Sequence, residues 1–240
     1  MSTKPLPILP GATLGILGGG QLGRMFAIAA RTMGYRVMVL DPDGASPAGQ
    51  MADVHLQADY ADHAALKQLG ATCAAVTTEF ENVPAASLIE LASYCRVSPG
   101  AAAVAIVQDR SHEKSWLADN GFATAPFALV YSEGDLDAAL ADTGTPALLK
   151  VSRFGYDGKG QARVGTLEEA RAAFREFGGQ PCVLEGFVEL EREVSVVLAR
   201  DDAGECALFP VAENRHDNGI LDVSIVPRSE EHTSELQSLT

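Results

Sequence analysis

A lysine and a glycine-rich loop lie side by side in the middle of this 240-residue sequence. The apolar run 146–149 leads to Lys150, and residues 155–160 contain three glycines. Glycine frees backbone N–H groups from Cβ crowding, so such a loop can turn several of them toward an anion. The pattern predicts a phosphate cradle. An ordinary hairpin, with Asp157-Gly158 as its turn, is the alternative that this segment alone leaves open.

A second glycine cluster follows a predicted strand at 13–17. Residues 18–23 satisfy the spacing GxGxxG, a helix is predicted over 24–33, and a strand at 36–40 ends in Asp41. A dinucleotide-binding fold places its ribose-binding acid at about this point, which makes an NAD-dependent oxidoreductase one hypothesis. The same strand, turn and helix occur wherever a parallel sheet presents a helix N-terminus to another ligand.

The acidic residues after the predicted strand 74–77 are further candidates. Glu79 and Glu81 stand at the carboxyl end of a parallel strand, where open α/β sheets bind ligands, and could bind an amine or ribose hydroxyls. The alternative is structural: Asn82 caps the helix that begins at Pro84, and the acids complement its dipole.

These residues are carried by two different patterns of elements. Alternating apolar runs and helical segments predict a Rossmann-like parallel sheet of about five strands within residues 1–100. An Ala-rich helix at 101–108 is expected as a spacer, before a second helix at 109–117. Strand pairs with intervening helices then predict an α+β domain within 101–227. Its expected elements include a helix capped by Thr166 and strands at 182–188, 191–199 and 207–213.

The composition excludes several classes of function. A formal charge of −14 disfavours nonspecific binding to nucleic acid or to an anionic membrane, because the long-range field repels phosphate. No apolar run reaches the roughly 18 residues of a membrane span, and the N-terminus lacks a signal-peptide core, so a cytoplasmic protein is expected. The four cysteines are scattered without a CxxC pair, which argues against zinc or a redox dithiol.

Five motifs together resemble a known family. They are GGGQLGRM at 18–25, TTEFENV at 77–83, QDR at 108–110, Lys150 with GYDGKGQ at 155–161, and RHDNGIL at 215–221. In this order, across residues 13–227, the sequence resembles the 5-(carboxyamino)imidazole ribonucleotide synthases of the ATP-grasp superfamily. The resemblance implies a Rossmann-like pre-ATP-grasp domain followed by an ATP-grasp domain that is incomplete in this chain.

The resemblance implies a ligase of de novo purine biosynthesis. Such enzymes carboxylate 5-aminoimidazole ribonucleotide with bicarbonate and convert ATP to ADP and phosphate, with Mg²⁺ as the metal and a homodimer as the expected assembly. Another ATP-grasp enzyme, such as a formate-dependent glycinamide ribonucleotide transformylase, is an alternative. So is a noncatalytic nucleotide-binding fragment.

The resemblance also implies roles for individual residues. Tyr156, Asp157 and Lys159 are expected to face the imidazole ribonucleotide and take part in catalysis. Gln21, Leu22 and Glu79 are expected to complete its pocket. The expected ATP-binding residues are Arg110, Lys150, Gly155, Tyr156, Asp157, Gly158, Lys159, Gly160, Gln161, Glu185, Gly186, Phe187, Val188, Glu193 and His216.

The end of the sequence departs from the family. Residues 228–240 resemble a translated sequencing adapter, which suggests a foreign tail, with a genuine polar tail as the alternative. The carboxylates that hold Mg²⁺ in the family are expected beyond this point. The chain as written is therefore expected to lack turnover.

Overall fold

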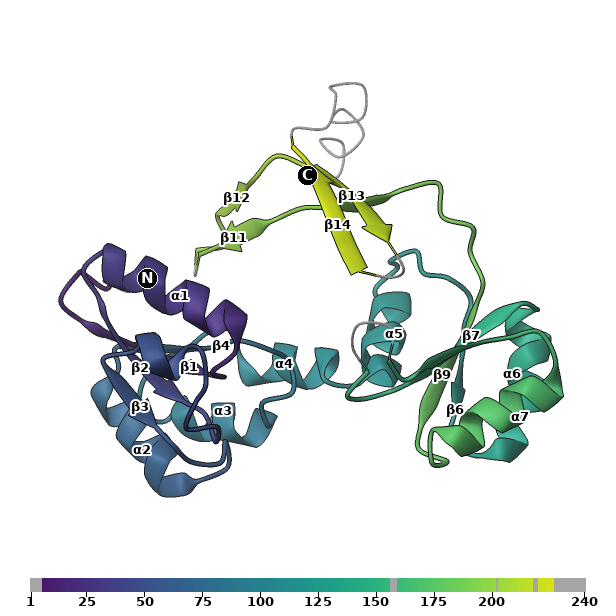
Figure 1. Ribbon diagram of the computed structural model, residues 1–240, viewed down its shortest axis with the longest axis horizontal. Coiled ribbons are helices and arrows are strands. Elements are labelled where there is room, and N and C mark those ends of the chain that lie inside the picture. The colour runs from purple at the N-terminus through teal and green to yellow at the C-terminus, as the bar shows by residue number, and fades with distance from the viewer. Residues whose placement is uncertain (1–5, 156–158, 202, 218–219, 227–240) are drawn as a thin grey trace. The chain divides into compact units, whose positions relative to one another are not determined.

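A computed structural model of the protein describes residues 6–155, 159–201, 203–217 and 220–226. The chain folds into two compact units (Figure 1). The N-terminal unit consists of Pro7–Thr124 together with Ser152–Phe154. The C-terminal unit contains Ala125–Val151 and the described residues from Gly155 onward. The predicted foreign tail lies outside the described residues.

A five-stranded parallel sheet forms the centre of the N-terminal unit. Its strands lie in the order β3-β2-β1-β4-β5, and every neighbouring pair is parallel, as the alternating pattern predicted. The strands are β1 (Thr13–Leu17), β2 (Arg36–Leu40), β3 (Val54–Leu56), β4 (Ala75–Thr78) and β5 (Arg96–Val97).

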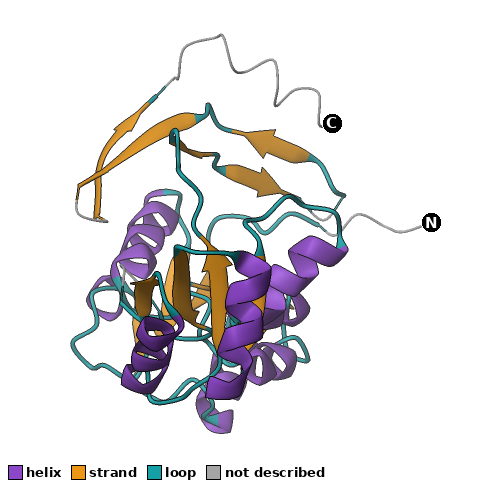
Figure 2. Cartoon of the chain, turned by 90° about the vertical axis from the view of Figure 1, so that its right-hand side faces the viewer, coloured by secondary structure: helices purple, strands orange, loops and turns teal. Residues whose placement is uncertain are grey.

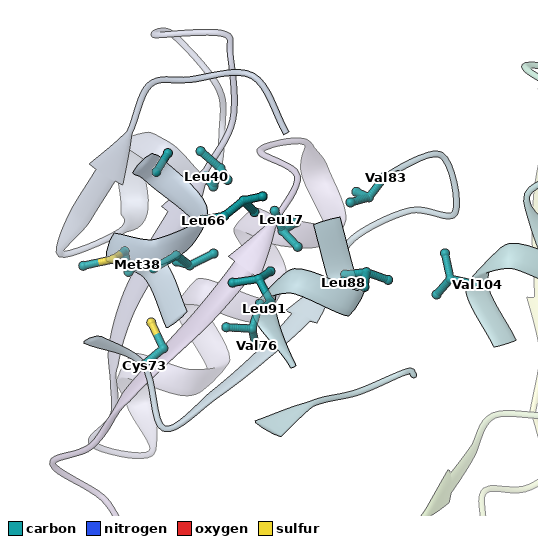
Figure 3. Close-up of a cluster of buried hydrophobic side chains, with 12 residues drawn as sticks. Leu17, Met38, Leu40, Leu66, Cys73, Val76, Val83, Leu88, Leu91 and Val104 are labelled. Carbon is teal, nitrogen blue, oxygen red and sulfur yellow. The ribbon is translucent and has the colours of Figure 1, made fainter. Parts of the chain in front are cut away.

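Both faces of this sheet are buried, because successive strand residues point to opposite faces and both kinds are apolar. Val37 and Val39 pack with helix α1 (Gln21–Thr32) on one face. Met38 and Leu40 pack on the other face with α2 (His63–Thr72) and α3 (Ala85–Leu91), whose leucines complete the cluster in Figure 3. The 3₁₀ turn η1 (Gly49–Met51) precedes β3.

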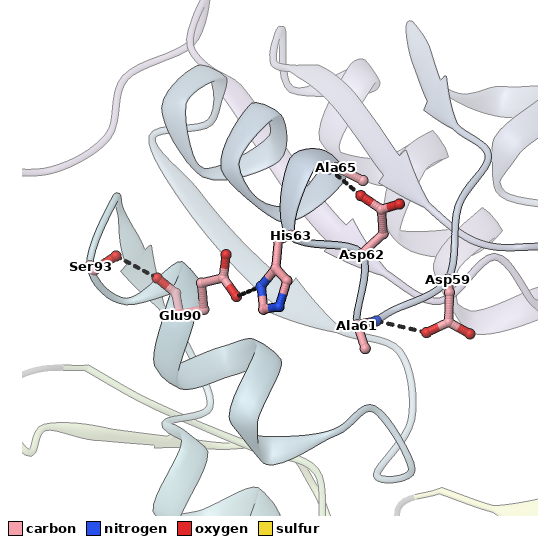
Figure 4. A network of polar contacts seen from close by, with 7 residues as sticks. All are labelled: Asp59, Ala61, Asp62, His63, Ala65, Glu90 and Ser93. Atoms are coloured by element: carbon pink, nitrogen blue, oxygen red, sulfur yellow. Dashed lines mark hydrogen bonds and ion pairs between the residues drawn. The ribbon is translucent and has the colours of Figure 1, made fainter.

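Polar contacts fix the start of α2. The Asp62 carboxylate accepts a hydrogen bond from the Ala65 N–H at 2.9 Å and caps the helix. The next residue, His63, places Nδ1 at 2.6 Å from Glu90 Oε2 and so links α2 to α3 (Figure 4). The His63–Glu90 contact therefore links the two helices of this face to each other.

The Ala-rich helix α4 (Ala101–Val107) is not a spacer. Its Val104 side chain is buried against Val83 and Leu88 in the core of the N-terminal unit. Helix α5 (Arg110–Asp119) belongs to the same unit. Within α4 only Val104 is fully buried, and this single apolar side chain attaches the helix to the core.

A four-stranded antiparallel sheet organises the first part of the C-terminal unit. Its strands lie in the order β6-β9-β7-β8. Helices α6 and α7 pack on one face, where Leu149, Leu184 and Phe174 are buried. Thr166 accepts a hydrogen bond from the Glu169 N–H at 3.2 Å and caps α7, as predicted. The elements are β6 (Phe127–Val130), η2 (Glu133–Asp135), α6 (Leu136–Thr143), β7 (Ala147–Val151), β8 (Gln161–Val164), α7 (Leu167–Glu176) and β9 (Cys182–Gly186).

The later strands differ from the prediction. The expected strand 191–199 is two strands, β10 (Glu193–Ser195) and β11 (Leu198–Arg200), and the expected strand 207–213 is also two, β12 (Cys206–Leu208) and β13 (Ala212–Asp217). The chain breaks because β10 pairs with β13 whereas β11 pairs with β12, and β13 also pairs with β14 (Ile220–Ile225). Figure 2 shows this region as strands and loops. Alternation in a sequence cannot reveal such a change of partner.

No helix in the described ranges combines the length and apolar character that a bilayer span requires.

We expect three of the four cysteines, Cys73, Cys182 and Cys206, to differ sharply in reactivity. Burial raises the pKa of Cys73 to about 12 and that of Cys182 to about 11, whereas Cys206 is exposed. At pH 8.5 the two buried thiols stay protonated and shielded, and alkylation proceeds through the thiolate. Mass spectrometry after brief iodoacetamide treatment should find Cys206 modified first, with Cys73 and Cys182 modified only in urea. Equal labelling of all three thiols in buffer would contradict the burial of Cys73 and Cys182.

Candidate functional site

The residues of the predicted phosphate cradle lie on the face of the four-stranded sheet that is opposite α6 and α7, called here the far face. Lys150 pairs with Gln161 on β8 and with Val183 on β9, so these three side chains share that face. The adjacent row is Arg163, Leu148 and Glu185, paired in the same way. The far face therefore carries two cations, a carboxylate and an apolar floor.

Lys150 forms an ion pair with Glu185 across β7 and β9. Its Nζ lies 2.9 Å from Glu185 Oε2, and the two side chains are 18% and 8% exposed. A pair this shielded from water interacts more strongly than a surface pair, and either partner alone is costly to leave buried. A phosphate that binds Lys150 must therefore share the ammonium with the Glu185 carboxylate.

The loop after Lys150 closes tightly at its base. Gly160 has φ +70°, and its carbonyl accepts a hydrogen bond from the Val151 N–H at 2.8 Å. A Cβ on Gly160 would lie 2.5 Å from Val151 Cγ2, so no larger residue fits there without movement. Lys159 is exposed. The predicted loop residues Tyr156, Asp157 and Gly158 lie outside the described residues.

The connector after β9 has fewer free backbone donors than its position suggested. The Gly186 N–H donates to the Pro126 carbonyl at 2.8 Å, and the Phe187 N–H donates to the Pro146 carbonyl at 3.1 Å. The Val188 N–H has no acceptor among the described residues. Val188 is therefore the one N–H of the three that can meet the edge of a base.

Two predicted nucleotide ligands lie together in the three-stranded sheet β10-β13-β14 of the C-terminal unit. His216 Nε2 on β13 is 3.6 Å from Glu193 Oε1 on β10. Asn214, which the sequence did not single out, pairs with Glu193 in register and donates to the same oxygen at 3.1 Å. A carboxylate held by an amide and facing an imidazole can accept hydrogen bonds from sugar hydroxyls.

The three residues of the QDR motif, 108–110, make different contacts. The Gln108 side-chain amide donates to the Val83 carbonyl and ties the α4–α5 junction to the TTEFENV segment. Asp109 caps α5 by accepting from the Ser111 N–H at 2.9 Å. The Nε atom of Arg110 is buried and has no hydrogen-bond partner among the described residues, so it can donate to a ligand.

A second set of bonds holds the segment that follows β7 in the N-terminal unit. The Arg110 N–H donates to the Ser152 carbonyl at 2.8 Å. The hydroxyls of Ser111 and Ser152 lie 2.7 Å apart, and both residues are buried. The start of α5 is thus fixed to a short piece of the chain only two residues from Lys150.

Glu79 lies at the N-terminus of α1, together with the predicted substrate ligands Gln21 and Leu22. One carboxylate oxygen accepts from the Gly20 N–H at 2.5 Å and the other from the Leu22 N–H at 3.1 Å. Helix α1 has no side-chain cap of its own, so a residue 59 positions away supplies the anion that its N-terminus attracts. The turn is occupied by the protein's own carboxylate.

Asp41 does not serve as a free ribose ligand. Its carboxylate is buried and accepts from the Gly19 N–H at 2.7 Å, the Tyr60 hydroxyl at 2.5 Å and the Asp43 N–H at 2.8 Å. Burial, and then the hydrogen bond to Asp41, raise the pKa of Tyr60 well above its usual value, so the phenol stays a donor. The glycines of residues 18–23 allow two carboxylates of the protein itself, those of Asp41 and Glu79, to lie close to the turn. The glycine spacing therefore no longer supports the NAD hypothesis.

The capping alternative for Asn82 is also wrong. Pro84 occupies the position before α3 without a side-chain cap, and the Asn82 amide donates instead to Glu81 at 2.9 Å. Asn82 Oδ1 is buried and has no partner within the described chain.

The structure thus brings some predicted residues together. Lys150, Gln161 and Glu185 share the far face, Glu193 contacts His216, and Glu79 contacts the main chain of Leu22. Arg163 on the far face was missed, although it stands two residues after Gln161 in a strand and so had to point the same way. Within the described residues, no group of three His, Cys, Asp or Glu side chains is placed to hold a metal ion.

Comparison with protein families and curated relatives gives a consistent result. The chain matches the model of the ribonucleotide synthetase preATP-grasp domain over residues 11–108 and that of the ATP-grasp domain over residues 115–240. It is 49% identical over 220 residues to the N5-carboxyaminoimidazole ribonucleotide synthase of Brucella melitensis and 42% identical over 223 residues to that of Bacillus subtilis. These alignments cover 91% and 92% of this chain, but 61% and 58% of the relatives.

Solved structures agree with the sequence relatives. The N5-carboxyaminoimidazole synthetase of Staphylococcus aureus complexed with ADP superposes with a TM-score of 0.91 at 37% identity, over 98% of this chain and 63% of that one. The Aspergillus clavatus enzyme in complex with ADP and 5-aminoimidazole ribonucleotide gives 0.83 at 26% identity, over 95% and 60%. The predicted fold class, a pre-ATP-grasp parallel sheet followed by an ATP-grasp domain, is confirmed. Because the ATP-grasp model alone matches more than half of its residues, this chain belongs to the ATP-grasp family.

Proposed function

We propose that this chain provides the nucleotide and ribonucleotide sites of an N5-carboxyaminoimidazole ribonucleotide synthase. The observation that carries the proposal is the far face, where Lys150 stands at the foot of a glycine loop and pairs with Glu185 at 2.9 Å. Relatives that share this order of elements have been solved with ADP, and one of them also with 5-aminoimidazole ribonucleotide. The chain spans 58–61% of the length of the curated relatives.

The two units would divide the ligands. In this proposal the C-terminal unit binds ATP, with Lys150 on the phosphates, Val188 at the base, and Glu193 with His216 at the ribose. Arg110, which belongs to the N-terminal unit, remains a predicted phosphate ligand, suited to that role by its fork of N–H donors. The N-terminal unit binds the ribonucleotide through Gln21, Leu22 and Glu79. Tyr156, Asp157 and Lys159 complete the predicted catalytic set.

The reaction has two steps. An oxygen of bicarbonate attacks the γ-phosphorus of ATP, the bond to the ADP oxygen breaks, and carboxyphosphate forms. The amine of the ribonucleotide then attacks the carboxyl carbon, or CO₂ released beside it, so that a C–N bond forms, phosphate leaves and the amine loses a proton. Phosphoryl transfer depends mainly on positioning and on neutralising charge, and Lys150 would supply a positive charge at the phosphates. For the Mg²⁺ predicted with ATP, the described residues offer no group of three His, Cys, Asp or Glu side chains that could hold a metal ion.

A chimera tests the reaction. Residues 7–226 of this chain would replace the matching segment of the Brucella melitensis relative, and ADP release would be followed with a coupled assay. We expect release to require both bicarbonate and 5-aminoimidazole ribonucleotide and to fall at least 100-fold with Lys150→Met. Release that depends on formate and glycinamide ribonucleotide would instead favour the transformylase. A chimera that folds but releases ADP under neither condition would contradict the proposal.

We also infer a homodimer for the complete enzyme. The family resemblance supports it, and so do Met25 and Ile28, which are exposed three residues apart on α1. Size-exclusion chromatography with light scattering should give twice the monomer mass for the chimera. A monomer mass at a protein concentration of about 50 μM would contradict the inference.

A further inference from the structure

A stacked pair, Arg163 and Phe187, occupies the far face beside the proposed nucleotide site. The guanidinium carbon lies 4.4 Å from the centroid of the Phe187 ring. No carboxylate of the described chain lies within ion-pair distance of Arg163. Arg163 is exposed, and a guanidinium over a ring is attracted to it even at an exposed site, so this contact favours one position of the Phe187 ring.

The strand register fixes both side chains on the far face. Arg163 on β8 is paired with Leu148 on β7, and Leu148 is paired with Glu185 on β9. Phe187 follows Glu185 by two residues, so it continues along the same face. The Phe187 N–H donates to the Pro146 carbonyl at 3.1 Å, which holds its backbone to the sheet. The hydrogen bond to Pro146 thus fixes the backbone of Phe187, and the Arg163 guanidinium packs on its ring.

This pair lies at the base end of the proposed site. Lys150 belongs to the row of Gln161, next to the glycine loop, whereas Arg163 belongs to the following row, about 7 Å farther along the strand. The connector residue Val188, whose N–H has no acceptor among the described residues, directly follows Phe187. A nucleotide with its phosphates at Lys150 and its base at Val188 would place the base beside the Phe187 ring.

We propose that Arg163 is a positioning residue that determines affinity for the nucleobase by holding the Phe187 ring. This inference rests on the proposed ATP site and adds a residue to it. The guanidinium is planar and stacks on one face of an aromatic ring, which leaves the rest of the ring to meet a purine. Lysine keeps the charge but cannot stack as a plane, so charge and stacking are separable by substitution.

Titration calorimetry on the full 240-residue chain tests the proposal, with ADP and inorganic pyrophosphate as the two probes. We expect Arg163→Met to weaken ADP binding about 10-fold and pyrophosphate binding less than 2-fold. Arg163→Lys should weaken ADP binding about 5-fold, despite the retained charge. Arg200→Met, an exposed arginine on β11, serves as the matched control and should change neither affinity.

A double-variant cycle adds a readout that a merely structural role would not move. In a Phe187→Leu background, Arg163→Met should cause no further loss of ADP affinity, because the ring that it holds is gone. Equal losses of ADP and pyrophosphate affinity, unchanged ADP binding by Arg163→Met, or additive effects in the cycle would each overturn the inference alone. Failure of the wild-type chain to bind ADP would overturn the proposed function and this inference with it.

Discussion

Lys150→Met should lower the stability of the C-terminal unit and strongly weaken its binding of ADP. The variant leaves the Glu185 carboxylate, 8% exposed, without its cation at 2.9 Å. Breaking a buried ion pair on one side costs about 3 kcal/mol, because a buried charge loses its compensation. ADP should bind at least 30-fold more weakly, which corresponds to about 2 kcal/mol for one charge-assisted phosphate contact. Urea denaturation followed by circular dichroism and calorimetric titration measure the two effects.

A second variant separates stability from binding. Lys150→Met/Glu185→Gln removes both charges and leaves an amide of nearly the same shape as the carboxylate, so most of the lost stability should return. ADP affinity should stay low, because the phosphate ligand is still absent. Recovery of ADP binding in this double variant would show that Lys150 acts only through the fold.

Gly18→Ala should destabilise the N-terminal unit by about 3 kcal/mol, the sum of a backbone cost and a packing cost. Gly18 has φ +108°, and a Cβ there would lie 2.7 Å from Glu79 Cβ. The left-handed backbone costs a side chain about 1–2 kcal/mol, and the clash adds a comparable overpacking cost. The single tryptophan of the chain, Trp116, lies in this unit, so its fluorescence in urea reports the loss.

Two other glycines serve as matched controls in the same unit. Gly11 has φ +95°, and a Cβ there would meet nothing within 4 Å, so Gly11→Ala isolates the backbone cost and should lose about 1 kcal/mol. Gly100 has φ −70° and open space, so Gly100→Ala should change stability by less than about 0.5 kcal/mol. Equal losses in all three variants would mean that the approach of Glu79 to the turn is not what requires glycine at position 18.

The strands of the parallel sheet were predictable because both faces of the sheet are buried, so each strand is a short, continuous apolar run in the sequence. The run 37–40 is apolar on both faces, and the helix after β3 begins at a recognisable cap, Asp62. The division of 191–199 into β10 and β11 was not predictable, since it depends on which strand each half meets, and the partners lie later in the chain.

The candidate site was predictable as a set of residues but not as a set of contacts. Lys150 and Glu185 were both identified, yet nothing in the sequence showed that residues 35 apart would form an ion pair. Glu79 was expected beside a ligand, and its two bonds to the N-terminus of α1 required the sheet order to be known. Arg163 carried a usable signal, because strand alternation from Gln161 places it on the same face.

Hydrogen–deuterium exchange of the chain with and without ADP tests the central claim most directly, namely that a nucleotide binds the far face of the four-stranded sheet. We predict that ADP slows exchange at Val188 and at residues 159–161, and that NADH slows exchange nowhere. Protection by either nucleotide confined to residues 18–23 would contradict the claim and return the nucleotide to the glycine turn of the N-terminal unit.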